Sequence, residues 1–208
     1  MPKSSITRLE EVGEATLAVE IETPQGFEAF PGQFVLIRAT VDGNEESGYY
    51  TISSPTVDET FEVTVAVDPD GTLGPWFAGR TLTDSVTVEG PYGEVQYTDD
   101  GDVLVLASGP GIGPAVGIAE RALDTGHEAT VVYGGSNPPH GDRLTRLEKE
   151  GATIIISDNL GTAVGSLDFD GVQTYVFGFQ GFVEEARTTL TDASVDLDDV
   201  EIEGFGPE

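Results

Sequence analysis

The sequence predicts a chain of two domains, a six-stranded antiparallel β-barrel over residues 1–98 and a doubly wound parallel-sheet α/β domain over residues 99–208. Three observations lead to this prediction. The first half is a succession of short β-rich segments separated by turn residues. After residue 102 continuous apolar segments alternate with helical ones, and a glycine-rich loop joins the first of these strands to the first helix.

Six segments of the first half have the composition of half-buried strands, rich in valine, isoleucine, threonine and tyrosine. Proline and glycine separate them as turns. The predicted strands span residues 5–12, 14–23, 33–41, 49–54, 60–68 and 85–90. One segment departs from the pattern: in GTLGPWFAG, residues 71–79, Pro75 suits the first turn of a short helix.

The second half alternates between strands and helices. DVLVLAS, residues 102–108, is a continuous apolar strand, as expected when helices cover both faces of a sheet. The further predicted strands span residues 128–135, 152–157, 174–179 and 199–205, and the predicted helices span 114–126, 141–151 and 182–193. This alternation is typical of a parallel sheet with right-handed crossovers, and we expect the domain boundary within YTDDGD, residues 97–102.

The charge of the chain is strongly negative. The formal net charge is −29, from 38 acidic and 9 basic residues, and the acids are spread along the whole length. Such a surface repels itself at low salt, whereas about 1 M salt shortens the Debye length to roughly 3 Å and removes most of the repulsion. We interpret the composition as halophilic, the alternative being an acidic protein of an ordinary cytosol. The same surface excludes nucleic acid as a partner.

Two residue types that often carry chemistry are scarce. The chain has no cysteine, which excludes disulfides, a thiolate nucleophile and an iron–sulfur cluster held by these residues. The two histidines, His127 and His140, are expected at the surface, so no metal site is expected. There is no apolar signal segment and no run of about 18 apolar residues, so we expect a cytoplasmic protein without membrane insertion.

The glycine-rich loop lies in LASGPGIGPAVGIAE, residues 106–120. Between the first strand and first helix of a doubly wound sheet, such a loop is where dinucleotide phosphates bind, because backbone N–H groups and the helix dipole face the ligand. The spacing SGPGIGPA is not G-x-G-x-x-G, and a strand-to-helix turn can also need glycine for geometry alone. The loop by itself leaves both interpretations open.

Several short motifs stand in an order that resembles one family. They are PGQFV (31–35), GYYTISSP (48–55), GTLGPWF (71–77), EGPYG (89–93), SGPGIGP (108–114) and FGFQGFVEEA (177–186). Over about 175 residues the chain thus resembles the ferredoxin–NADP reductase-like flavoprotein superfamily. The resemblance implies a β-barrel FAD domain followed by a Rossmann-like NAD(P) domain.

The resemblance implies a set of FAD-binding residues on the barrel. Tyr50 would lie against the flavin ring or its ribityl chain, and Thr51 would act in catalysis by placing a hydroxyl and a backbone N–H near the hydride-accepting nitrogen. The other implied residues are Ser53 and Ser54 beside this turn, Val65, Ala66 and Val67 along the ribityl and adenosine side, and Gly71, Thr72, Leu73 and Gly74 at the pyrophosphate. Tyr50 and its hydroxyl-bearing neighbours also suit ordinary strand positions.

The resemblance also implies a nucleotide site on the second domain. The implied NAD(P) loop consists of Gly109, Pro110, Gly111, Ile112 and Gly113. Gly178 and Phe179 would shape the pocket for the nicotinamide end. Phe205 is near the family's C-terminal aromatic, which shields the flavin, so the resemblance implies a catalytic role for it; a packed aromatic is the alternative.

The chain departs from the family pattern at three places. Gly48 stands where the family has arginine, so a charge-assisted bond to the FAD phosphate, worth roughly 1.5–3 kcal/mol, is missing unless another cation such as Arg80 replaces it. Phe177 stands at the family's cysteine, where we expect it to alter nicotinamide stacking. Arg143 comes late in the chain for contact with a 2′-phosphate, which favours NADH over NADPH.

The reaction implied by the resemblance is hydride transfer from NAD(P)H to FAD, followed by electron transfer to a separate acceptor. That acceptor would be a ferredoxin or a catalytic subunit, because these residues hold no iron–sulfur relay of their own. The electron-transfer subunit of class B dihydroorotate dehydrogenase is also similar, but it carries a cysteine cluster that is absent from this chain. A non-catalytic flavin or nucleotide sensor and a structural subunit with an empty site remain as alternatives.

Overall fold

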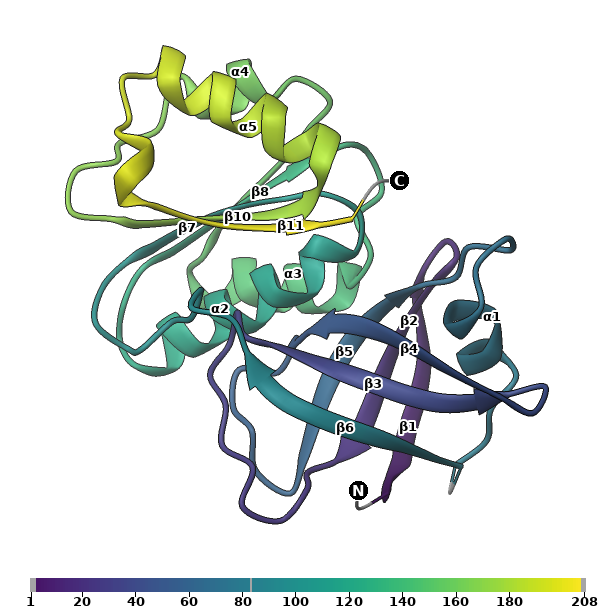
Figure 1. Ribbon diagram of the computed structural model, residues 1–208. Helices are drawn as coiled ribbons and strands as arrows, with labels where there is room; N and C mark the ends of the chain where they lie inside the picture. Colours follow the sequence, from purple (N-terminus) through teal and green to yellow (C-terminus); the bar gives the residue numbers. More distant parts are fainter. Residues whose placement is uncertain (1–2, 83, 207–208) are drawn as a thin grey trace.

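The computed structural model describes residues 3–82 and 84–206, which form two layered units (Figure 1). The first is a six-stranded antiparallel sheet with strand order β4-β3-β6-β1-β2-β5, and the bridge between Ile52 and Val63 joins its two ends into a barrel. Its elements are β1 (Lys3–Gly13), β2 (Thr16–Glu22), β3 (Phe34–Val41), β4 (Asn44–Thr51), β5 (Thr60–Ala66), α1 (Leu73–Ala78) and β6 (Ser85–Tyr92).

The second unit is a five-stranded sheet with strand order β11-β10-β7-β8-β9, parallel throughout. Its strands are β7 (Val103–Ala107), β8 (Ala129–Gly134), β9 (Thr153–Ser157), β10 (Gln173–Phe179) and β11 (Val200–Phe205). Its helices are the short 3-10 turn η1 (Gly109–Gly111), α2 (Ile112–Asp124), α3 (Gly141–Glu150), α4 (Leu160–Val164), α5 (Gln180–Asp192) and the 3-10 turn η2 (Leu197–Asp199). The predicted fold class, a β-barrel followed by a doubly wound α/β domain, is confirmed.

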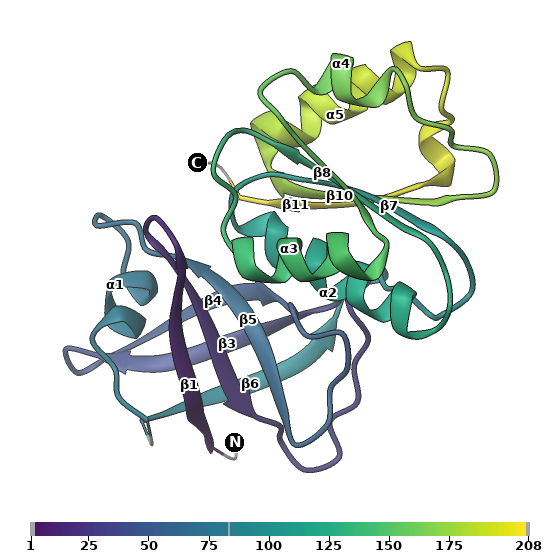
Figure 2. The same cartoon turned by 180° about the vertical axis from the view of Figure 1, so that it is seen from behind.

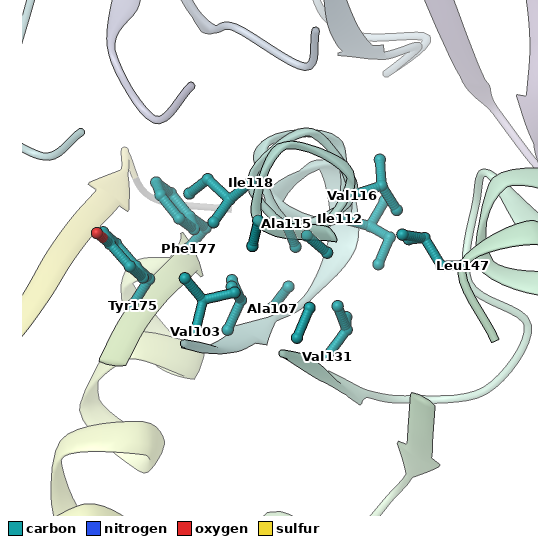
Figure 3. Packing of buried hydrophobic residues seen from close by; sticks show 14 of the residues in the cluster. Val103, Ala107, Ile112, Ala115, Val116, Ile118, Val131, Leu147, Tyr175 and Phe177 are labelled. Carbon is teal, nitrogen blue, oxygen red and sulfur yellow. The ribbon is translucent and has the colours of Figure 1, made fainter. Parts of the chain in front are cut away.

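The helices are divided between the two faces of the parallel sheet. Both views show α2 and α3 between this sheet and the barrel, while α4 and α5 cover the opposite face (Figures 1 and 2). Figure 3 shows the core under α2, where Ile112, Ala115 and Val116 of the helix pack on Val103 and Val131 of the strands. Because α2 is buried on this side by its own sheet and on the other by the barrel, nearly all its residues are apolar or small.

Two elements differ from the prediction. The strand predicted at 49–54 begins earlier, at Asn44, and ends at Thr51, because residues 44–51 pair with β3 across the tight Asp42–Gly43 turn despite their weak strand propensity. Helix α4 was not predicted, since it is only five residues long and Gly161 interrupts its pattern. Its start is marked by Asn159, whose side chain accepts a hydrogen bond from the N–H of Thr162 at 2.8 Å.

The segment between β6 and β7 contains the predicted boundary between residues 98 and 99. Val95 and Tyr97 precede that point, yet both are buried in the core of the α/β unit. The hydroxyl of Tyr97 donates to the carbonyl of Gly101 at 3.0 Å. Across residues 3–82 and 84–206, no helix combines the length and apolar character needed to cross a membrane.

Candidate functional site

A half-open cavity of about 480 Å³ lies where the barrel meets the carboxyl edge of the parallel sheet. We call it the interdomain slot. Its barrel side consists of Phe34, Tyr49, Thr51 and Tyr92, and its other side of Glu203, Gly204, Phe205 and Gly206. Both domains therefore contribute, at the edge of a doubly wound sheet where ligands bind.

The barrel side of the slot is a row of residues across three neighbouring strands. Phe34 of β3 pairs with Thr51 of β4 on one side and with Tyr92 of β6 on the other, and paired residues point to the same face. Tyr49, two residues before Thr51, shares this face. Its ring meets Phe34 edge-on at 5.5 Å and Tyr92 at 6.5 Å between centroids.

These aromatic rings are incompletely covered by protein. Tyr49 is 67% exposed and Tyr92 is 41% exposed. A cluster of uncovered aromatic side chains in a cavity is the usual lining of a site for a flat conjugated ligand. The slot therefore has the lining expected for a flat conjugated ring, and Thr51 is among its residues.

The opposite side of the slot comes from the end of β11. Phe205 pairs in register with Phe179 at the end of β10, and the two rings meet edge-on at 6.3 Å. Phe205 thus lines the slot and is at the same time packed against Phe179. Burial raises the pKa of the Glu203 carboxyl, which also lines the slot.

Tyr50 lies on the other face of β4 from the slot. Its ring meets Phe77 of α1 edge-on at 6.0 Å, and burial raises the pKa of its hydroxyl to about 12. A Cβ at Gly48 would come 3.0 Å from the Tyr50 ring and 3.2 Å from Leu73. The ring of Tyr50 therefore occupies the space into which a side chain at Gly48 would extend.

Sequence reasoning therefore missed part of the slot. Tyr49, Phe34, Tyr92 and Glu203 line it and were not among the predicted residues, whereas the predicted Tyr50 does not line it. The alternation of strand β4 was the available signal, because residues at even spacing from Thr51 share its face.

Ser53 and Ser54, which follow Thr51, face the α/β domain and strand β5 and do not line the slot. Ser53 is fully buried, with its Oγ 2.8 Å from Thr64 Oγ1. Ser54 Oγ accepts a hydrogen bond from the N–H of Glu62 at 2.6 Å. They hold the turn after Thr51 against strand β5.

The residues implied at the ribityl and pyrophosphate side surround the start of α1. Val65 is buried in the barrel core, Ala66 is exposed, and the N–H of Val67 donates to Ala15 at 2.7 Å. Gly74 packs closely on the end of β5, since a Cβ there would meet the carbonyl oxygen of Ala66 and come 3.0 Å from Val67 Cα. The other residues implied at this side are Gly71 and Thr72, which precede α1, and Leu73, which begins it.

Arg80 is beyond the C-terminal end of α1, away from the residues implied at the pyrophosphate. Its guanidinium carbon lies 4.7 Å from the centre of the Trp76 ring, and its Nε donates to the Trp76 carbonyl at 3.1 Å. The Arg80 guanidinium therefore lies over the Trp76 ring. It does not point toward Gly71 or Gly74, which are at the other end of the helix.

The glycine-rich loop forms η1 and the first turn of α2. Each glycine has a different neighbour. Gly109 has φ +52° and faces the Phe179 ring, which a Cβ would meet at 3.4 Å. A Cβ at Gly111 would come 2.7 Å from the carbonyl carbon of Phe177, and one at Gly113 would come 2.5 Å from Ser53 Oγ. The implied loop residues Pro110 and Ile112 lie between these glycines, in η1 and at the start of α2.

Phe177 does not occupy the nicotinamide position expected for it. It is fully buried in the core under α2 and stacks on Tyr175 at 6.4 Å with nearly parallel rings (Figure 3). Gly178, the next residue, faces the other way: a Cβ there would come 2.8 Å from Ser108 Oγ. The expectation that Phe177 alters nicotinamide stacking was wrong, because strand alternation directs its side chain into the core.

His140 is also not at the surface as expected. It is 3% exposed, at the start of α3 in a left-handed conformation, and its Nε2 lies 2.8 Å from Thr64 Oγ1 of the barrel. Burial, together with the charges of Arg143 and Arg8, lowers its pKa to about 3. The expectation failed because the segment that precedes α3 docks on the barrel, a contact between distant parts of the sequence.

The barrel followed by the parallel sheet has the arrangement of a FAD-binding domain followed by an NAD-binding domain. Residues 4–97 match the family described as oxidoreductase FAD-binding domain. The fold and this match agree with the ordered motifs of the sequence and support the resemblance of the chain to the ferredoxin–NADP reductase-like flavoprotein superfamily.

Individual relatives agree with this assignment. The glycine betaine monooxygenase reductase subunit of Chromohalobacter salexigens is 36% identical over 100 residues, which cover 46% of this chain and 27% of that protein. The ferredoxin reductase component of 3-ketosteroid-9-alpha-monooxygenase from Mycolicibacterium smegmatis is 28% identical over 194 residues, which cover 84% of this chain and 55% of that protein. The chain thus spans about half or less of the length of these relatives.

A solved structure has the same arrangement of both domains. The flavohem-like FAD/NAD-binding domain of nitric oxide dioxygenase from Vibrio cholerae O1 biovar El Tor superposes with a TM-score of 0.85 at 16% identity. The match covers 99% of this chain and 98% of that one. At this identity the likeness concerns the fold.

Proposed function

We propose that this chain is an NAD(P)H-dependent flavoprotein reductase that passes hydride from NAD(P)H to FAD and delivers electrons to a separate acceptor. The observation that carries the proposal is the interdomain slot, in which uncovered aromatic rings of the barrel face the carboxyl edge of the parallel sheet. The match of residues 4–97 to the FAD-binding domain family supports FAD as the flavin. When bound, FAD accepts two electrons as hydride and can release them singly.

The residues of the slot would bind and orient the reactants. Tyr49 and Phe34 offer apolar faces to the flavin ring, and Thr51 offers a hydroxyl at the same end of β4. Phe205 covers the slot from the α/β side and excludes water there. Hydride transfer in such a site depends on how the two reactants are positioned and on exclusion of water. The residues that line the slot supply no general acid–base pair for this step.

The pyridine nucleotide is proposed to lie along the loop at Gly109, with its nicotinamide end near Gly178 and Phe179. Among the arginines, Arg143 follows β8 most closely, but its nitrogens are engaged: Nε with Glu120 at 2.9 Å and Nη1 with Glu62 at 2.8 Å. A 2′-phosphate would have to displace these carboxylates. We therefore propose NADH as the preferred donor.

The electron acceptor is proposed to be a separate protein, a ferredoxin or a partner subunit. The two relatives above are reductase components of monooxygenases, which supports a partner of this kind. The even spread of 38 acidic residues supports cytoplasmic function in concentrated salt, where screening removes the repulsion between them.

A second candidate, a flavin-binding module without reductase activity, is favoured by one observation. Gly48 supplies no cation for the FAD pyrophosphate, and Tyr50 and Leu73 crowd the place where an arginine would begin. Weak binding of FAD would then limit activity. The backbone N–H groups around residues 71–74 are the remaining donors proposed for the phosphates.

The test is a visible absorption spectrum of the purified protein in molar KCl with added FAD, before and after anaerobic addition of NADH. A bound flavin spectrum that bleaches supports the reductase. A bound flavin that neither NADH nor NADPH bleaches supports the binding module. No flavin binding at any FAD concentration overturns both candidates.

A pair of variants tests the slot itself. Tyr49→Ala should weaken FAD binding about 2- to 10-fold, the effect of losing one aromatic contact worth about 0.5–1.5 kcal/mol. Phe30→Ala is the matched control, because Phe30 is 45% exposed but does not line the slot. Equal effects of the two variants in a fluorescence titration would place the flavin elsewhere.

A further inference from the structure

The two domains are connected by a set of mostly buried polar side chains, which we call the interdomain network. Its members are Ser53, Glu62 and Thr64 of the barrel, and Glu120, His140, Arg143 and Arg146 of the α/β domain. Arg146, the most exposed member, pairs with Glu120. Five of the seven members are less than 9% exposed, and the network borders an open cavity of about 760 Å³ that Glu62, Glu120, His140, Arg143 and Arg146 help to line.

Arg143 makes the largest number of contacts in this network. Its Nη1 donates to Glu62 at 2.8 Å, and its Nη2 donates to Glu120 at 2.6 Å and to the backbone carbonyl of Ser53 at 2.8 Å. One planar guanidinium therefore connects helix α3 with helix α2, strand β5 and the turn after β4. Such bidentate, charge-assisted contacts fix orientation as well as distance.

His140 adds a second connection. Its Nε2 lies 2.8 Å from Thr64 Oγ1, which in turn lies 2.8 Å from Ser53 Oγ. Its backbone N–H donates to the carbonyl of Val12 at 2.7 Å, so the same residue is also tied to β1. Side chain and backbone together hold the start of α3 against two parts of the barrel.

The network reaches the proposed flavin site through Ser53. Thr51, two residues earlier, lines the slot, and the intervening Ile52 is fully buried. The N–H of Ser53 donates to the carbonyl of Glu62 at 2.8 Å, so both its backbone groups and its side chain are held. Any movement of α3 relative to the barrel is therefore transmitted to Thr51.

We propose that Arg143 and His140 are positioning residues: through Ser53 they fix Thr51 and the barrel side of the slot relative to its other side on β11. The proposal rests on the reductase function proposed above. Hydride transfer requires reacting atoms about 3–3.5 Å apart, and a misplacement of 1 Å can lower the rate about 100-fold. The slot has sides from two domains, so its width depends on contacts that hold those domains in one orientation.

The first experiment measures the relative position of the domains without any cofactor. The chain has no cysteine, so Glu22→Cys on β2 and Glu185→Cys on α5, both exposed, can be spin-labelled uniquely. Pulsed electron paramagnetic resonance then gives the distance distribution between the domains. We expect Arg143→Gln and Thr64→Val, each added to this labelled pair, to broaden that distribution.

A matched control breaks an ion pair inside one domain. Arg38→Gln removes the contact between Arg38 Nε and Glu89, which lie 2.6 Å apart on β3 and β6. The distribution of distances between the two spin labels should stay as narrow in Arg38→Gln as in the parent. Thr64→Val removes only one hydroxyl and creates no buried unpaired charge, so it tests the network even when Arg143→Gln does not fold.

The second experiment measures single-turnover flavin reduction at saturating NADH. The rate should fall about 10- to 100-fold in Arg143→Gln and Thr64→Val while flavin content stays unchanged, and Arg143→Lys should recover part of it. A distance distribution as narrow as the parent's, or a broadened one with an unchanged rate, overturns the proposal. If the parent itself shows no flavin reduction, the reductase function fails, whereas the distance measurement still decides whether the network orients the domains.

Discussion

Gly113 offers the sharpest test of how helix α2 meets the barrel. A Cβ added there would come 2.5 Å from Ser53 Oγ and 2.6 Å from Thr64 Cβ, whereas ordinary van der Waals contact begins at 3.4 Å. The Thr64 Oγ1 atom would lie closer still, so Gly113→Ala requires the helix and the barrel to separate by at least about 0.9 Å. Overpacking of this kind costs about 3 kcal/mol at the upper end of its usual range, and the better helix propensity of alanine returns about 1 kcal/mol.

The expected result is a net loss of about 2 kcal/mol of unfolding free energy, which corresponds to a fall of about 4–8 °C in Tm for a chain of this size. Calorimetry in molar KCl measures it. Gly181→Ala in α5 is the matched control, because nothing lies within 4 Å of its added Cβ and its stability should stay equal or rise. A Gly113→Ala protein as stable as the parent would refute the close contact between α2 and the barrel.

Three further predictions concern pH, cofactor and nucleotide. Lowering the pH from 7 to 5 should reduce the unfolding free energy by up to about 2 kcal/mol, because unfolded histidine takes up a proton near pH 6.5 whereas His140, with a pKa lowered to about 3, stays neutral when folded. The raised pKa of Glu62 acts in the opposite direction as the pH falls, and urea titrations of the parent and of His140→Gln separate the two effects. Gly48→Arg should not tighten FAD binding in a fluorescence titration, because its Cβ already meets the Tyr50 ring at 3.0 Å; a clear gain would show that Tyr50 moves aside readily. Gly109→Asn should raise the KM for NADH and leave flavin content unchanged, since asparagine tolerates the left-handed conformation and faces only the rim of a ring at 3.4 Å; an equal loss of flavin would contradict separate sites.

The fold class followed from the sequence because it depends on local periodicity. Strand β7 is apolar at every position and helix α2 follows it at once, so a parallel sheet was the consistent interpretation. The beginning of β4 was misjudged, because Asn44 to Ser47 pair with β3 through register and not through propensity. The positions of Thr51 at the slot and of His140 against Thr64 arise from contacts between distant segments, which no local pattern specifies.

The glycines of α2 show where the sequence signal had two meanings. Phosphate binding and close helix packing both require the absence of a Cβ, and the residues from Gly109 to Gly117 contain glycines that suit either. Gly113 and Gly117 are four residues apart and so share one face of the helix, and a Cβ at Gly117 would come 2.6 Å from the carbonyl oxygen of Ser53. Glycines at this spacing on one face of a helix indicate close packing of the helix against a neighbour. Gly109 is then the loop glycine that faces the Phe179 ring, at the carboxyl edge of the parallel sheet. The helix that begins at the proposed nucleotide loop thus presses on the segment that carries Thr51, and the two proposed sites are joined through Ser53.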